Sequence, residues 1–135
     1  MSYPIADLDG MSPDVAKLLK SAKIRTTGRL LEEARSLRGR KALASKTGLT
    51  EKLLLRWANM ADRMRIKGIG EDNAKLLEAA GVVTVRELKY RNPAKLAKSM
   101  ADANARRKLV RILPTEGAVK RWIEAAAELD PKISY

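Results

Sequence analysis

An internal repeat constrains the fold of this chain more than any other feature of its sequence. Leu8–Leu30 and Ile66–Leu88 are related by an offset of 58, and nine of the 23 aligned positions are identical. Further along, Thr50–Trp57 and Thr115–Trp122 share a Thr-Glu pair followed by an Arg-Trp pair, now at an offset of 65. Repeats of this kind are typical of supersecondary units, so the chain is predicted to contain two tandem units.

The two units are predicted to span residues 1–62 and 63–135, and no Ser/Gly-rich linker separates them. A helix over residues 50–65 is expected to end the first unit and to begin the second. The chain has 135 residues, of which 45% are hydrophobic. This length and composition allow a buried core without metals or disulfides.

Helix start and stop signals recur along the chain. Ser12 before Pro13 is a typical N-cap followed by a favoured first helical residue, and Thr84 with Glu87 fits a capping box. No segment shows the sustained alternation that is typical of strands. The sequence therefore predicts an all-α fold of eight or more short helices. Further N-caps are expected at Thr50, Asn92 and Thr115, and helix-ending glycines at Gly48 and Gly81.

Missing residue types exclude several classes of function. The chain has no Cys and no His, so it has no disulfide, thiol nucleophile, zinc finger or histidine-based catalytic group. No uncharged run approaches the roughly 20 residues of a membrane helix, and the N-terminus lacks the basic flank and apolar core of a signal peptide. We expect a cytoplasmic protein with neither a membrane partner nor a small-molecule substrate.

The acidic residues do not suggest an active site. They occur mostly singly or at expected helix starts, for example Glu51 and Glu116, rather than in clusters that would serve a hydrolase or a catalytic metal. No phosphate-binding loop with a following Lys and Ser or Thr is present. We expect a protein that is not an enzyme and that has no metal site.

Glycines mark two sharp turns at equivalent places in the repeat. In the second glycine turn (Ile66–Gly70), Gly68 and Gly70 permit backbone angles that side chains forbid, and Ile69 is expected to fill the space beneath the turn. The first glycine turn (Leu8–Ser12) is a less perfect copy. Each turn places backbone N–H groups at the start of a helix, which is a favourable arrangement for an anion.

These turns resemble the helix-hairpin-helix motif. The stretch from Leu77 to Leu88 also resembles the helical repeats of the RNA polymerase alpha C-terminus and of NusA. Nearly the whole chain, including Arg56-Trp57 and Asn92-Pro93, is similar to a bacterial family of helix-hairpin-helix proteins catalogued as a domain of unknown function (the 4332 family). The resemblance implies two tandem helix-hairpin-helix units in a SAM-like orthogonal helical bundle.

The helix-hairpin-helix class implies DNA binding without sequence preference, in which turn amides bind phosphates. In some members, turn carbonyls also hold a monovalent cation, here those of Gly68–Gly70; no other cofactor is implied. The resemblance places the amide contacts at Gly68, Ile69 and Gly70 and at Gly10, Met11 and Ser12, with charge from Lys67, Lys75 and Lys17.

Acidic residues near both turns leave a second interpretation open. Asp72 and Asp14 occupy a position where DNA-binding members often carry Lys or Arg, and Glu71 adds another negative charge. Such acids stabilise a helix start but repel a phosphate there. The turns can then be purely structural, and the alternative function is a protein–protein interaction module in a nucleic-acid-processing or transcription complex.

Basic runs lie at corresponding places in the two units. With 28 Lys and Arg against 16 Asp and Glu, the net charge is +12. Residues 34–50 contain no acid, and residues 88–115 contain only Asp102. Neutralising about four phosphates would give a salt slope of about −3.6 on duplex DNA. The candidate phosphate ligands in these runs are Arg38, Arg40, Lys41, Arg106, Arg107 and Lys108.

The two tryptophans occupy matching positions in the repeat. Trp57 and Trp122 are predicted to anchor the two cores, since an aromatic content of 4% without Phe does not suggest a base-stacking surface. Arg56 and Arg121 immediately precede them and are expected to point elsewhere on their helices.

Overall fold

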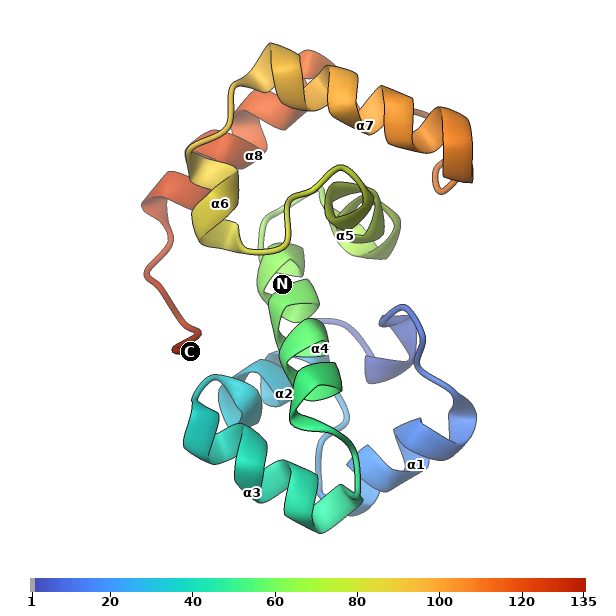
Figure 1. Cartoon of the computed structure of the whole chain (residues 1–135), viewed down its shortest axis with the longest axis vertical. Coiled ribbons are helices and arrows are strands. Elements are labelled where there is room, and N and C mark those ends of the chain that lie inside the picture. Colours follow the sequence, from blue (N-terminus) through green and yellow to red (C-terminus); the bar gives the residue numbers. More distant parts are fainter. Residues whose placement is uncertain (1) are drawn as a thin grey trace. The chain divides into compact units, whose positions relative to one another are not determined.

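The computed structural model describes residues 2–135, which form eight α-helices, one 3-10 helix and no β-strand (Figure 1). The predicted all-α class and helix number are confirmed. An isolated bridge between Pro4 and Thr26 is the one β-type pairing in this range. The elements are η1 (Ile5–Asp7), α1 (Pro13–Ser21), α2 (Thr27–Ala34), α3 (Leu37–Thr47), α4 (Glu51–Met64), α5 (Gly70–Ala79), α6 (Val85–Lys89), α7 (Pro93–Arg107) and α8 (Glu116–Glu128).

The described residues divide into two compact units. The first extends to Arg65 and includes Lys132–Tyr135, and the second is Ile66–Pro131. Helix α4 therefore belongs to the first unit, and the last four residues return to it. Each unit contains four α-helices, in the order α1–α4 and α5–α8.

Helix caps repeat between the units, and those at Thr50, Thr84 and Thr115 are caps that the sequence predicts. The Thr26 hydroxyl accepts a hydrogen bond from Arg29 N at 3.1 Å, and the Thr84 hydroxyl accepts one from Glu87 N at 2.9 Å. The Thr50 and Thr115 hydroxyls cap α4 and α8 in the same way, at 3.1 and 3.0 Å. Each cap satisfies one of the orphan N–H groups at a helix start.

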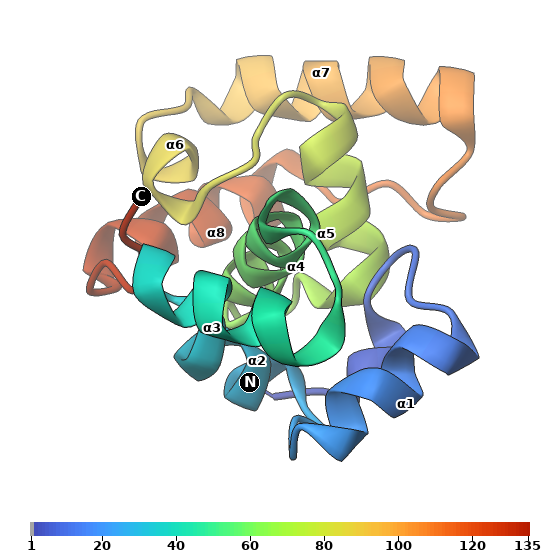
Figure 2. The same ribbon diagram turned by 60° about the horizontal axis from the view of Figure 1, so that its bottom comes forward.

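The first unit is built around α4. Helices α2 and α3 pack against it and against each other, as Figure 2 shows from below. Leu54, Trp57 and Met60 on α4 are at most 1% exposed, and Leu30 and Leu31 on α2 contribute to the same buried set. Burying apolar area of this kind supplies the main stabilisation of such a unit.

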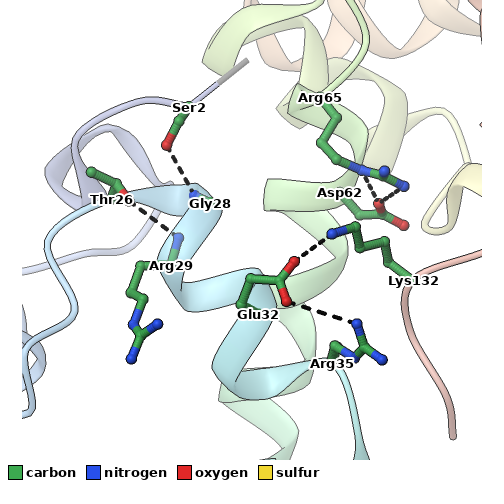
Figure 3. Close-up of polar contacts among 9 residues, drawn as sticks. All are labelled: Ser2, Thr26, Gly28, Arg29, Glu32, Arg35, Asp62, Arg65 and Lys132. Atoms are coloured by element: carbon green, nitrogen blue, oxygen red, sulfur yellow. Dashed lines mark hydrogen bonds and ion pairs between the residues drawn. The ribbon is translucent and has the colours of Figure 1, made fainter.

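The last four residues form a C-terminal strap (Lys132–Tyr135) on the first unit. The Lys132 ammonium pairs with the Glu32 carboxylate, which also lies 3.7 Å from the Arg35 guanidinium (Figure 3). The hydrogen bond from Lys132 lowers the pKa of Glu32 below its usual value. Further along the strap, the Tyr135 hydroxyl donates to Asn59 Oδ1 at 2.8 Å.

Asp62 on α4 gives the first unit a testable pH response. Its side chain pairs with Arg65, with 2.7 Å between Asp62 Oδ1 and Arg65 Nε (Figure 3). Burial raises the pKa of Asp62 above its usual 3.8, although Arg65 opposes this shift. Ionisation of Asp62 therefore costs stability as the pH rises through the folded-state pKa, and this cost is absent below the unfolded-state pKa.

The variant Asp62→Asn lacks this titration. The stability of the wild-type protein relative to Asp62→Asn is therefore expected to increase when the pH falls from about 7 to about 4. Urea unfolding of both proteins across this range measures the difference. A difference that stays constant, or that shifts in favour of Asp62→Asn in acid, would contradict this assignment.

The second unit has α5 and α8 packed on α7, with α6 against α8. Figure 1 shows α8 beginning behind α7 and running from there toward α6. The buried set includes Leu76, Leu88, Leu96 and Met100, all 0% exposed. After α7, the Asn104 side chain bonds both the N–H and the carbonyl of Val110, at 2.9 and 3.1 Å, which holds the turn that follows α7.

Candidate nucleic-acid interface

The first glycine turn is closed by side chains from α4. Gly10 adopts φ +82°. The carbonyl of Asp9 accepts hydrogen bonds from Arg56 Nη1 at 3.1 Å and from Trp57 Nε1 at 2.9 Å, and the Asp9 carboxylate pairs with Arg56 at 2.8 Å. The expectation that Arg56 points away from its neighbouring tryptophan is wrong, because both side chains reach the same carbonyl.

Helix α1, which follows the first turn, is capped by the side chain of its N-cap residue. The Ser12 hydroxyl accepts from Val15 N at 3.2 Å, and Asp14 lies in the first turn of α1. Gly10 and Ser12 are exposed, Met11 is half-buried, and Lys17 is exposed on α1. At this helix start, one orphan N–H is already satisfied and an acidic side chain stands beside the others.

The second glycine turn has a different environment. Gly68 and Gly70 adopt φ +90° and +62°, and Ile69 between them is 2% exposed, as its predicted role beneath the turn requires. Lys67 and Gly68 are exposed. A Cβ atom on Gly68 would stand 3.4 Å from the indole nitrogen of Trp122, so this N–H lies beside the turn.

Helix α5 begins at the second turn without a side-chain cap. Its N-cap residue is Ile69, which offers no oxygen, and Glu71 and Asp72 lie in its first turn. Both acids are exposed, and Lys75 one turn further on is half-buried. The start of α5 therefore combines amides that have no side-chain acceptor from the N-cap with two negative charges close by.

The basic run on α3 separates into exposed and buried cations. Arg38 and Lys41 are exposed. Arg40 is 2% exposed and donates to the carbonyls of Ala34 at 2.9 Å and Ser134 at 2.8 Å. The prediction of Arg40 as a phosphate ligand does not fit this environment, because its guanidinium is buried and joins α2 to the C-terminal strap.

The basic run on α7 ends in three consecutive exposed cations. Arg106 and Arg107 lie in the last turn of the helix, and Lys108 follows as its C-cap with φ +51°. No ion pair with an acidic residue of the described range 2–135 involves any of the three, whereas Lys98 lies 3.8 Å from Asp102. Cations also interact favourably with the C-terminal end of a helix dipole.

Within the second unit, Trp122 lies beside Gly68 of the second glycine turn, and Arg106, Arg107 and Lys108 lie together at the end of α7. Both tryptophans are core residues as predicted, with Trp57 1% and Trp122 5% exposed. The roles of their indole N–H groups were not predicted: the Trp57 N–H donates to the Asp9 carbonyl, and the Trp122 N–H lies beside Gly68. The sequence signal that would have indicated them is the equivalent position of the two tryptophans in the repeat, one in each unit.

Across residues 2–135, no group of three or more acidic side chains is placed to hold a metal ion. No helix in this range combines the length and apolar character that crossing a bilayer requires.

A family model with the description Domain of unknown function (DUF4332) matches residues 9–129. The matched range includes most of the first glycine turn, the whole of the second, and all eight α-helices. No curated protein and no solved structure matches the chain. The resemblance to this family that the sequence suggests is thereby confirmed.

Proposed function

The chain belongs to the DUF4332 family, and we propose that it is a non-catalytic protein that binds duplex or branched DNA through the phosphates, with little readout of base sequence. The observation that carries this proposal is the cluster of Arg106, Arg107 and Lys108, three adjacent exposed cations at the end of α7. In the proposal, these cations contact the DNA backbone, and the exposed Arg38 and Lys41 on α3 of the first unit are further candidate contacts.

The energetic basis is the release of counterions. Each phosphate that a Lys or Arg neutralises releases part of the condensed cation atmosphere of DNA. Three unpaired cations can contribute fully to this release, because they do not first have to break an ion pair within the protein. A net charge of +12 adds longer-range attraction at low salt. Contacts of this kind position a protein on DNA but do not distinguish bases.

A protein–protein interaction module is the second candidate function. In the loop after α7, Ile112 is 87% exposed and Leu113 is 41% exposed. Exposed apolar side chains of this size are suited to contact with another protein. Under this function, the adjacent cations of α7 would contact an acidic protein surface, and the affinity for DNA would be weak.

Fluorescence anisotropy of the full chain with labelled duplex, forked and single-stranded DNA tests the proposal. At about 50 mM salt we expect micromolar or tighter binding to duplex and forked DNA. Two duplexes of unrelated sequence should bind within about threefold of each other, since a single specific base contact would separate them by about 1–3 kcal/mol. Absence of binding by micromolar protein at this salt would reject the proposal and favour the protein-interaction function.

A further inference from the structure

Two equivalent tryptophans are placed differently relative to their glycine turns. The Trp57 N–H is used within the protein, since it donates to the Asp9 carbonyl of the first glycine turn at 2.9 Å. The Trp122 N–H lies beside Gly68 of the second glycine turn, and no hydrogen bond joins it to any residue in the range 2–135. This difference is unexpected for two residues at matched positions of a repeat.

The Trp122 side chain is 95% buried, yet solvent reaches its N–H. The indole as a whole is 5% exposed. Asn73 Oδ1 is the one fully buried side-chain nitrogen or oxygen without a partner among the described residues, so the Trp122 nitrogen is not among the buried orphans. A rigid donor at the surface, held by a buried ring, is well suited to an acceptor from outside the chain.

The two glycine turns also differ in charge: the first carries a carboxylate and the second carries a lysine at the equivalent position. The position of Asp9 in the first turn is occupied by Lys67 in the second, so no carboxylate is available there to attract the arginine that precedes the tryptophan. Accordingly, the Arg56 guanidinium reaches Asp9 of the first turn, at 2.8 Å. The Arg121 guanidinium instead lies beside Gly117 on its own helix, where a Cβ atom would be 3.7 Å from Arg121 Nη1. The second turn is left with an exposed lysine.

The caps of the following helices differ as well. Helix α5 lacks a side-chain cap, whereas each of the other seven α-helices in residues 2–135 has one. An anionic oxygen at the start of α5 would accept from first-turn amides and would be favoured by the helix dipole. At α1, Ser12 already provides that oxygen.

We propose that the second glycine turn is the phosphate-binding copy, in which Trp122 Nε1, the α5 amides and Lys67 bind one DNA phosphate, and that the first glycine turn is a structural copy closed by Asp9, Arg56 and Trp57. This inference rests on the proposed function, and it adds to the cations of α7 a phosphate site at one of the two turns. Asp72 in the first turn of α5 lowers the affinity of the site by repulsion.

The two indole N–H resonances provide the most direct test, because the chain has two tryptophans. They are assigned in ¹H–¹⁵N spectra of the full chain from the variants Trp57→Phe and Trp122→Phe. When a short DNA duplex is added, the Trp122 indole resonance is expected to shift, and the Trp57 resonance is expected to stay in place. A Trp122 resonance that does not move while anisotropy reports binding would overturn the inference but leave the proposed function standing.

The same two variants are a matched pair for affinity and stability. Trp122→Phe removes the free donor and is expected to weaken duplex binding about tenfold, and the loss of buried indole volume should also lower its Tm. Trp57→Phe loses the same volume and in addition a hydrogen bond within the protein, so it should lower Tm further than Trp122→Phe and leave the affinity unchanged well below Tm. Equal losses of affinity in both variants would contradict the division between the turns. If the wild-type protein binds no DNA, the proposed function and this inference fail together.

Discussion

Replacing Arg40 with methionine is expected to lower the free energy of unfolding by about 2–4 kcal/mol. The guanidinium is 2% exposed, and its two hydrogen bonds are 2.9 and 2.8 Å long. Methionine retains much of the buried volume but leaves the carbonyls of Ala34 and Ser134 without this donor. Since one of the two bonds holds the C-terminal strap, the strap should also become more susceptible to proteolysis.

Urea unfolding followed by circular dichroism measures the loss of stability. The matched controls are Arg38→Met and Lys41→Met, because both side chains belong to the same helix and the same basic run but are exposed. Each control should change the free energy of unfolding by no more than about 0.5 kcal/mol. Equal stability of Arg40→Met and the two controls would show that the guanidinium does not have the structural role assigned to it.

Reversing the charges of Arg106, Arg107 and Lys108 to glutamate is expected to weaken duplex binding about 500-fold at about 0.1 M salt. The estimate assumes one phosphate contact for each cation. Each lost contact then reduces the affinity about eightfold at this salt and reduces the salt slope by about 0.9. Fluorescence anisotropy of the triple variant with one duplex at several salt concentrations measures both quantities.

A control with the same net charge separates local contacts from general attraction. The control changes three exposed cations of the first unit to glutamate, all outside the candidate interface: Lys20, Arg25 and Lys52. Like the triple variant of α7, it lowers the net charge from +12 to +6 (12 − 6 = 6). The control should retain the wild-type salt slope. If both variants lose the same affinity and slope, DNA binding depends on net charge alone, and α7 is not the interface.

Local signals in the sequence predicted most of the fold. The caps at Ser12, Thr50, Thr84 and Thr115 all form hydrogen bonds to an amide three residues later. Each depends on a hydroxyl oxygen close in sequence to the amide that it accepts from, so such bonds can be read from a few residues. The repeat then extended these assignments from one unit to the other.

Contacts between distant segments were not predicted. Arg40 lies in a run of cations, and its burial depends on Ser134, which is 94 residues away in the sequence. A weaker local signal was present, since Arg40 precedes the buried Leu43 by three positions and therefore shares its face of α3. Arg56 likewise reaches Asp9 over 47 residues. The repeat gave no indication of this pair, because its second copy carries Lys67 where the first carries Asp9.

The dependence of DNA affinity on salt tests the central claim most directly. The wild-type chain is titrated into a labelled duplex between about 50 and 200 mM salt, and the logarithm of the binding constant is plotted against that of the salt concentration. If about four of the candidate cations bind phosphates at the same time, the plot is a straight line with a slope of about −3.6. A slope near zero, or binding that is lost when the base sequence of the duplex is changed, would contradict phosphate recognition as the basis of function.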